Sequence, residues 1–266
     1  MSLITSPQNP LIKQLRRLSQ RKHRRREGLF VVEGIRPVLA ALENGWSVQQ
    51  LIVCPERLNS PVALDAVAAA AERGLPVAEI GAALLDKVAG WEHGTGLLAL
   101  VASELPALSS WQVPEQALLL AVEAPGDPGN LGTIMRTLDA VAGHGLILVG
   151  GGTDPFHPGA VRASMGALFT VPVAAVASLA ELYAWAGAQQ LPVWATSARA
   201  TDDCWSAEWP ARLMLLMGSE QTGLSAGALA AAANQIRIPM WGDASSLNLA
   251  IASSLLLYEY RRRFPA

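Results

Sequence analysis

Residues 236–264 read IRIPMWGDASSLNLAIASSLLLYEYRRRF, and this stretch decides how the carboxyl end of the chain folds. A short β-prone run stops at Pro239, a loop follows with Gly242 and Asp243, and a long apolar helix then begins. Side-chain oxygens at the start of a helix accept hydrogen bonds from the free N–H groups of its first turn. The small polar residues at that position are Ser245, Ser246 and Asn248. Helix capping alone is a sufficient account of the serines unless other segments point to the same place.

Two earlier segments have the same organisation. Residues 117–142 contain an apolar strand, the loop APGDPGNLGT and a helix that carries Arg136. Residues 214–225 contain an apolar strand that ends at Gly218 and is followed by a lone carboxylate, Glu220. In open α/β sheets the ligand binds outside the carboxyl ends of the strands. We therefore expect the three loops to meet in one crevice.

Three motifs in these segments resemble those of the SpoU branch of the SPOUT superfamily, the RNA ribose 2′-O-methyltransferases that use S-adenosylmethionine. They are GNLGTIMRT at 129–137, MGSEQTGLS at 217–225 and IPMWGDASSLNLAIA at 238–252. Their order and spacing agree over most of the chain beyond residue 117. The resemblance implies an α/β domain with a carboxy-terminal trefoil knot, a bent cofactor, and a homodimer with site residues from both subunits. No metal is implied, because transfer from a sulfonium only dissipates a positive charge.

The resemblance also implies particular site residues. The catalytic set is Arg136, Asn130, Glu220, Ser246 and Asn248. In this interpretation the arginine holds a phosphate or lowers the proton affinity of the 2′-hydroxyl, and the amides and the carboxylate orient the arginine or the ribose. The backbone and apolar walls for the cofactor are Gly218, Ile238, Met240 and Leu247. One departure is that Leu249-Ala250 stands where the family often has Val-Ser, so position 250 receives no role.

Strands and helices alternate before the first motif and predict a smaller α/β domain. The expected organisation is a basic helical arm at 1–28, an α/β domain at 29–102, a proline-containing linker at 103–116 and the methyltransferase domain at 117–266. The opening segment resembles the L30e-like domain that binds the RNA substrate in many SpoU enzymes. The presence of that domain favours ribosomal RNA over transfer RNA as the expected substrate.

The amino-terminal residues are strongly basic although the net charge of the chain is only −2. Residues 1–36 hold nine of the twenty Lys and Arg residues, which is the pattern of a nucleic-acid-binding surface. A solvated helix face is the alternative. We expect RNA contacts from this arm, part of it mobile until RNA binds, and from one arginine in a later R-S-GA-like segment: Lys13, Arg16, Arg17, Arg24, Arg25, Arg26 and Arg162.

Composition excludes other classes of protein. No apolar run approaches the roughly 20 residues of a membrane helix, and the first residues do not read as a secretory signal, so we expect a cytoplasmic protein. Cys54 and Cys204 are far apart and lack a metal-binding pattern, which is typical of buried free thiols.

Three alternatives to a ribosomal RNA methyltransferase remain. The first is a transfer RNA ribose methyltransferase, and the second is a non-catalytic RNA-binding or ribosome-assembly protein that keeps the fold. The third is a Rossmann dehydrogenase or nucleotide-binding enzyme. It would require GxGxxG after the first strand and an acidic residue about twenty positions later, and the sequence has neither in the right place.

Overall fold

The computed structural model describes residues 3–88 and 94–265. The chain forms two compact units. The first contains Met1–Glu104 and Pro155–Thr170, and the second contains Leu105–Asp154 and Val171–Ala266. The sequence analysis placed residues 155–170 in the second domain and residues 1–28 in a separate arm. In the structure both of these segments pack within the first unit.

The first unit is built on a four-stranded mixed sheet with the strand order β1-β4-β2-β3. Its strands are β1 (Leu29–Glu33), β2 (Val48–Val53), β3 (Val77–Glu79) and β4 (Leu97–Ala102). Strand β4 is antiparallel to both β1 and β2, whereas β3 is parallel to β2. The connecting helices are α3 (Ile35–Glu43), α4 (Pro61–Glu72) and α5 (Ala82–Val88). The alternation of strands and helices predicted from the sequence is confirmed.

The basic amino-terminal segment forms two short helices, α1 (Pro10–Arg17) and α2 (Arg21–Glu27). Asn9 caps α1 by accepting a hydrogen bond from the backbone N–H of Leu11 at 2.9 Å. Apolar side chains of α1 and the turn after it are buried in one cluster with strands β2 and β4 and helix α5: Ile12, Leu15 and Leu18. This segment is therefore not a separate arm, and partial mobility before RNA binding stays a prediction. It is an integral part of the first unit.

Arg24 differs from its basic neighbours because it is only 2% exposed. Its guanidinium donates to the backbone carbonyls of Leu18 at 3.0 Å and Ser19 at 2.8 Å. A buried charge must be hydrogen-bonded, and these carbonyls at the end of α1 supply acceptors. Arg24 thus joins α2 to α1, and the prediction that it contacts RNA is corrected.

Residues 155–170 add two short helices to the first unit, α7 (Pro158–Ala163) and the 3₁₀ turn η2 (Ala167–Phe169). Aromatic rings from both parts of this unit pack together: Phe30, Trp46, Phe156 and Phe169. Trp46 Nε1 also donates to the carbonyl of Phe169 at 3.3 Å. These contacts explain why this segment leaves the domain in which its sequence neighbours fold.

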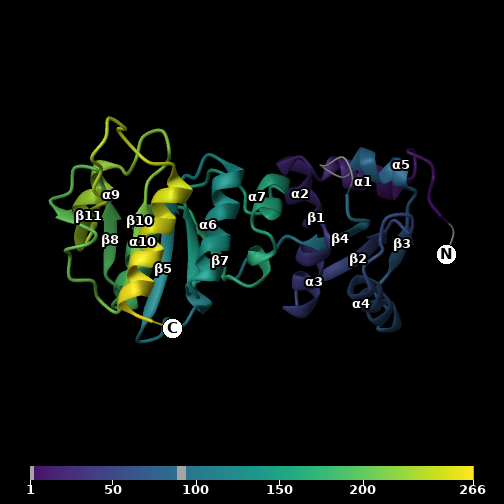
Figure 1. Ribbon diagram of the computed structural model, residues 1–266, viewed down its shortest axis with the longest axis horizontal. Helices are drawn as coiled ribbons and strands as arrows, with labels where there is room; N and C mark the ends of the chain where they lie inside the picture. Colours follow the sequence, from purple (N-terminus) through teal and green to yellow (C-terminus); the bar gives the residue numbers. More distant parts are fainter. Residues whose placement is uncertain (1–2, 89–93, 266) are drawn as a thin grey trace. The chain divides into compact units, whose positions relative to one another are not determined.

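The second unit is a seven-stranded parallel sheet with the order β7-β6-β5-β10-β8-β11-β9 (Figure 1). Its strands are β5 (Ala117–Glu123), β6 (Gly145–Val149), β7 (Val173–Val176), β8 (Val193–Thr196), β9 (Asp202–Asp203), β10 (Arg212–Met217) and β11 (Asn234–Arg237). The central strands are buried apolar runs, as parallel sheets covered on both faces require. The two-residue strand β9 was not predicted, since two aspartates carry no strand pattern.

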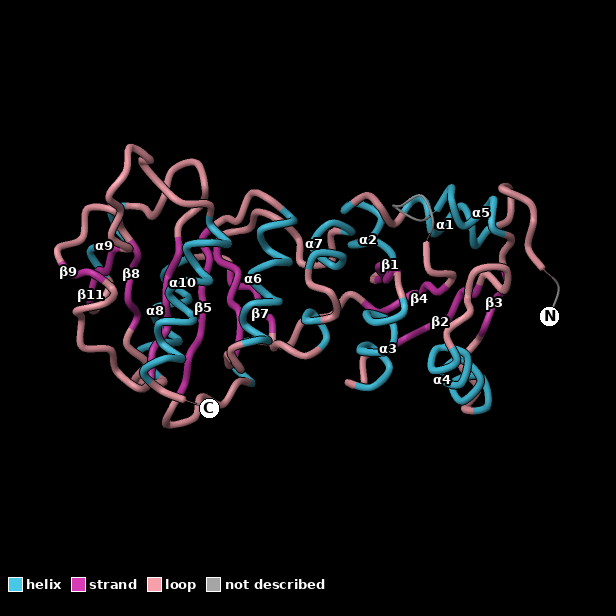
Figure 2. The backbone as a smooth tube through the Cα atoms, viewed as in Figure 1, coloured by secondary structure: helices cyan, strands magenta, loops and turns pink. Residues whose placement is uncertain are grey.

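Helices cover the sheet of the second unit on both faces (Figure 2). They are α6 (Pro128–Ala140), α8 (Leu179–Ala188), α9 (Ala226–Ala231) and α10 (Leu249–Arg263), with a 3₁₀ turn η1 (Leu108–Ser110). Side chains of α8, α9 and η1 share one buried cluster with alternate residues of the central strands. Helices α6 and α10 pack against each other, as Figure 1 also shows.

Both cysteines are buried free thiols, as predicted. No helix in the described residues has both the length and the apolar character to cross a membrane.

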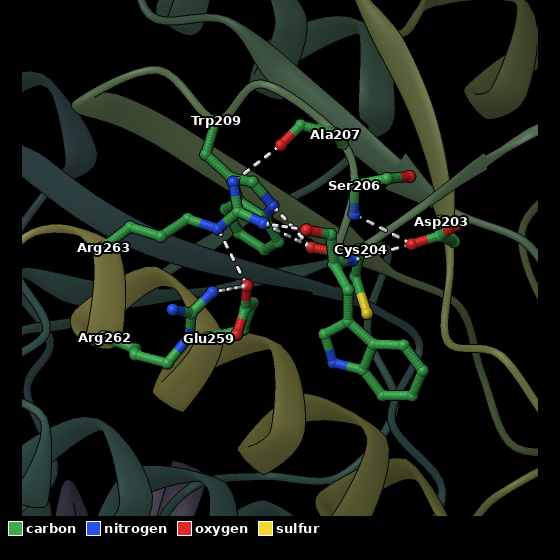
Figure 3. A network of polar contacts seen from close by, with 9 residues as sticks. Asp203, Cys204, Ser206, Ala207, Trp209, Glu259, Arg262 and Arg263 are labelled. Atoms are coloured by element: carbon green, nitrogen blue, oxygen red, sulfur yellow. Dashed lines mark hydrogen bonds and ion pairs between the residues drawn. The ribbon is translucent and has the colours of Figure 1, made fainter.

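The carboxyl end of α10 is fixed to the loop between β9 and β10 by Arg263 (Figure 3). Its guanidinium donates to the carbonyls of Ala207 at 2.7 Å, Cys204 at 3.3 Å and Trp205, and its Nε donates to Glu259 at 2.8 Å. Arg262 shares the Glu259 carboxylate but has a side chain that is 67% exposed. The two adjacent arginines therefore differ in the number of backbone groups that depend on them.

Replacing Arg263 with alanine should lower the free energy of unfolding by about 2 kcal/mol, because loop carbonyls and a mostly buried carboxylate lose their donors. The matched variant Arg262→Ala removes a mostly exposed guanidinium and leaves Glu259 its hydrogen bond from Arg263, so it should cost about 0.5 kcal/mol or less. Urea denaturation of both variants measures the difference. Equal losses would show that the loop carbonyls do not depend on Arg263.

Candidate functional site

A pocket of about 760 Å³ lies at the carboxyl ends of three neighbouring strands of the second unit. Its walls come from residues 196–199 after β8, residues 217–224 after β10 and the loop between β11 and α10. The register of β8 with β10 and β11 brings these strand ends to one edge of the sheet. The prediction that loops after the motif strands meet in one crevice is confirmed for the second and third motifs.

The pocket wall contains every residue that the sequence assigned to the cofactor. They are Gly218, Ile238, Met240 and Leu247. Three residues of the predicted catalytic set also line it: Glu220, Ser246 and Asn248. The segment at 196–199, which includes Arg199, was missed by the sequence analysis. The available signal was a polar Thr-Ser pair directly after an apolar strand, as in the three motif segments.

Gly218 allows the loop after β10 to fold back on itself. A Cβ atom there would lie 2.2 Å from the carbonyl carbon of Gly223 and 2.3 Å from the backbone nitrogen of Leu224. Ser219 and Gly223 form a β-bridge, and the backbone N–H of Gly223 donates to Ser219 O at 3.0 Å. Any side chain at position 218 would therefore open the loop that forms this wall of the pocket.

The carboxylate of Glu220 joins this loop to the first motif. It accepts hydrogen bonds from the backbone N–H groups of Gly126 at 3.0 Å and Asp127 at 3.4 Å, and from Asn130 Nδ2 at 3.0 Å. Burial favours the neutral acid, but these hydrogen bonds outweigh it and hold the pKa of Glu220 below its ordinary value. The contribution to stability is present above the unfolded pKa, about 4.3, and is lost as the pH falls below it.

Asn130 and Asn248 continue the same network. Asn248 Nδ2 donates to Asn130 Oδ1 at 3.0 Å, while Asn248 Oδ1 accepts from the N–H groups of Ala250 at 2.9 Å and Ile251 at 3.2 Å. Asn248 is therefore the N-cap of α10, as its position in the sequence predicted. One chain of hydrogen bonds now runs from Glu220 through Asn130 to Asn248, so all three motifs contact one another.

Arg136 lies on the exposed face of α6, six residues after Asn130. It is not part of the pocket wall, and its guanidinium makes no hydrogen bond or ion pair with any residue in 3–88 or 94–265. The expected hydrogen bonds from this arginine to Asn130 and Asn248 are absent from the described structure, because Asn130 Oδ1 accepts from Asn248 and Asn248 Oδ1 caps α10. Its role as a catalytic residue stays a prediction.

A shallow hollow of about 270 Å³ lies on the surface between α6 and α10 and is lined by residues of both helices. Thr133 of α6 borders it, and the large apolar residues around it are strongly exposed: Ile251 at 55%, Leu255 at 47% and Tyr258 at 56%. Of the leucines of α10, Leu255 is exposed, whereas Leu249, Leu256 and Leu257 are buried.

The basic residues predicted to contact RNA have different environments in the first unit. Lys13, Arg16 and Arg25 are exposed, whereas Arg17 and Arg26 are paired with Glu27 at 3.3 Å and 3.2 Å. Arg162 of α7 forms a 3.9 Å ion pair with Glu33. Exposed and unpaired cations are the ones that gain most from phosphate contacts. Lys13, Arg16 and Arg25 therefore remain the strongest candidates.

The pocket has the size and chemistry that S-adenosylmethionine requires. Its volume falls within the range of small-molecule sites, and its wall combines apolar side chains with the backbone of glycine-containing loops. Carboxylate and guanidinium groups also reach it, from Glu220, Arg199 and Arg237, and suit a ligand with ammonium and carboxylate groups. No group of three or more His, Cys, Asp or Glu side chains within 3–88 and 94–265 is arranged to hold a metal ion.

Residues 117–258 match the model of the SpoU rRNA Methylase family, and residues 9–99 match the MRM3-like substrate binding domain. The crystal structure of an AdoMet-bound rRNA methyltransferase from Sinorhizobium meliloti has a TM-score of 0.92 and 33% identity, and the match covers 100% of this chain and 99% of that chain. The 23S rRNA (uridine(2479)-2′-O)-methyltransferase of Streptomyces viridochromogenes is 33% identical over 253 residues, which are 92% of this chain and 87% of that protein.

The 23S rRNA (guanosine(2553)-2′-O)-methyltransferase RlmP of Bacillus subtilis is 26% identical over 267 residues, covering 98% of this chain and all of that protein. The family match spans more than half of this chain and includes the three motifs that the hydrogen bonds of Glu220, Asn130 and Asn248 connect. The protein therefore belongs to the SpoU rRNA methylase family.

Proposed function

We propose that this protein is an S-adenosylmethionine-dependent enzyme that methylates a ribose 2′-oxygen of ribosomal RNA. The observation that carries the proposal is the pocket at the ends of β8, β10 and β11, joined to the first motif by Glu220. Its wall includes all four residues assigned to the cofactor. The named relatives act on 23S rRNA, which favours ribosomal over transfer RNA as the substrate.

S-adenosylmethionine, when bound, supplies an electrophilic methyl group on a sulfonium. The residues of this chain bind the cofactor and orient the reacting ribose. Ile238, Met240 and Leu247 provide apolar contacts, and Gly218 shapes the loop opposite them. The ionised Glu220 keeps Asn130 and the start of α6 in place, so the first motif is fixed before the RNA binds.

We assign binding of the substrate RNA at the reacting nucleotide to Arg136. A guanidinium that has no partner among the described residues is suited to hold a phosphate bidentately and to stabilise charge that develops on the 2′-oxygen. It lies on the same side of α6 as Thr133, which borders the exposed apolar hollow against α10. A second copy of the chain bound at that hollow would enclose the arginine together with the apolar side chains.

The proposed assembly is a homodimer formed through Ile251, Leu255 and Tyr258 of α10. Three neighbouring large apolar side chains, each about half exposed, favour burial against a partner. Sedimentation should give a dimer that Leu255→Asp dissociates; a wild-type monomer at micromolar concentration would contradict it. We also propose the trefoil knot that the family resemblance implies; the crossing of the chain from β11 near one sheet edge back to α10 beside α6 is compatible with it. A cytoplasmic location follows from the proposed substrate.

The experiment that tests the function is transfer of labelled methyl from S-adenosylmethionine to unmodified ribosomal and transfer RNA transcripts, followed by alkaline digestion. Label in an alkali-resistant dinucleotide is the expected result, since a methylated 2′-oxygen cannot attack the neighbouring phosphate. Label in single nucleotides would move the target to a base. No label together with no cofactor binding by calorimetry would favour a non-catalytic assembly protein.

The variant Arg136→Ala should lower methyl transfer by about 100- to 1,000-fold, the range expected when a charge-stabilising group is removed, and should leave cofactor affinity within about threefold. Its matched control is Asp139→Ala, an exposed residue one turn further along α6 that should retain transfer. Turnover is measured with the labelled methyl assay and affinity by calorimetry. Normal turnover of Arg136→Ala would refute the role of this residue.

Glutamine at Lys13, Arg16 and Arg25 together should weaken RNA binding and reduce the slope of log affinity against log salt by about 2, because each phosphate contact releases about 0.7–0.9 counterion. Arg73→Gln, in the same unit, is an exposed control and should change neither quantity appreciably. Arg24→Gln should instead lower the melting temperature, because it removes the buried donor to Leu18 and Ser19. An unchanged slope in the triple variant would mean that these cations only face solvent.

A further inference from the structure

Two stacked indoles lie beside the pocket and outside the hydrophobic core, so packing does not account for their exposed positions. Trp241 is 84% exposed, which is the largest fraction of any large apolar side chain in the described part of the chain, and Trp205 is 46% exposed. The centroids of their rings are 5.4 Å apart, and the ring planes differ by 11°. A stack of this kind leaves one flat aromatic face open to solvent.

Trp205 is the fixed member of this pair. Its backbone N–H donates to Asp203 Oδ1 at 2.9 Å, as does the N–H of Ser206, and its carbonyl accepts from Arg263. Hydrogen bonds from Ser206 and the N–H of Trp205 lower the pKa of Asp203, so this carboxylate is ionised. It accepts these hydrogen bonds from residues of its own turn. Arg263 ties the loop around Trp205 to the end of α10; Figure 3 shows its contacts and the hydrogen bond between Ser206 and Asp203.

Trp241 belongs to the loop that forms the pocket wall. Met240, directly before it, lines the pocket. The exposed Arg237 also lines the pocket and pairs in register with Asp203 of β9, so it lies between the pocket and the Trp205 loop. Arg199 adds a second exposed guanidinium to the same wall. Arg237 also interacts with the carboxylate of Asp203, so Arg199 is the cation more available to a phosphate. An open aromatic face beside exposed guanidinium groups is the combination that binds single-stranded nucleic acid.

We propose that Trp241, supported by Trp205, stacks on an unpaired base of the substrate RNA close to the nucleotide that is methylated. This inference rests on the proposed function and adds to it the form of the substrate: a base in a loop or bulge, unstacked from its helix. Every base has a π-face, so the contact contributes affinity and position with little discrimination among bases. Stacking adds no ion pair, so this contribution is independent of salt.

Replacing Trp241 with alanine should lower kcat/KM for unmodified 23S rRNA transcript by about 5- to 150-fold, the range for loss of one base–aromatic stack. Affinity for S-adenosylmethionine should stay within about twofold. Trp241→Phe keeps an aromatic face and should recover most of the loss. Because the indole is 84% exposed, both variants should keep the wild-type melting temperature. Asp243→Ala, an exposed residue of the same loop, is the control and should cause no loss.

Two further measurements distinguish stacking from other roles. The slope of log affinity against log salt should be the same for Trp241→Ala as for the wild type, unlike that of the basic triple variant. Titration with a single-stranded oligoadenylate should quench tryptophan fluorescence in the wild type, and Trp241→Phe should remove most of the quenching.

Three results would overturn the inference. The first is unchanged kcat/KM and unchanged fractional quenching by oligoadenylate in Trp241→Ala while the wild type transfers methyl normally, which leaves the proposed function intact. The second is a parallel loss of cofactor affinity, which would make the indole a cover of the cofactor pocket. The third is a change from dimer to monomer, which would make it a protein contact. If the wild type itself transferred no methyl, the proposed function would fail, and the oligoadenylate titration would still test the stack.

Discussion

The contacts of one carboxylate hold the site together. Glu220 follows β10 and accepts hydrogen bonds from the loop after β5 and from Asn130 of α6. These two strands are neighbours in the sheet, yet their sequences are about ninety residues apart, because the strand order changes direction between them. A crevice forms at such a point, and without a link across it the two loops would be free to separate. The ionised Glu220 supplies that link.

Further contacts extend this constraint to the end of the chain. Asn248 bonds to Asn130 through its amide nitrogen and caps α10 through its oxygen, so the start of the last helix is set by the first motif. The end of the same helix is set by Arg263 and the loop around Trp205. The loop that carries Met240 and Trp241 lies between β11 and the start of α10 and is therefore fixed at both ends. A pocket wall built this way keeps its shape before any ligand binds, which reduces the ordering cost of binding.

Basic side chains have different roles in the two units. In the first unit α1 packs on the sheet through apolar residues, α2 is joined to the end of α1 by the buried Arg24, and exposed cations such as Arg16 and Arg25 face solvent. In the second unit the guanidinium groups of Arg261 and Arg263 bond to backbone carbonyls, and both are structural. The composition counts all of these as basic residues. Burial and hydrogen bonding decide which of them are available to a phosphate.

The sequence by itself determined the family, the α/β fold, almost every long strand and helix, and the motif residues of the pocket wall, but not the wall segment at 196–199. It could do so because buried parallel strands are apolar runs, and because loops that bind ligands carry glycine and small polar residues in a characteristic order. Only the tertiary structure decided that Arg24 is buried, that residues 155–170 fold with the first unit, and that Asn130 and Asn248 bond to each other and not to Arg136. These outcomes depend on contacts between residues far apart in the chain. A local pattern specifies the type of a side chain, but its partner is fixed only when the strands and helices have packed.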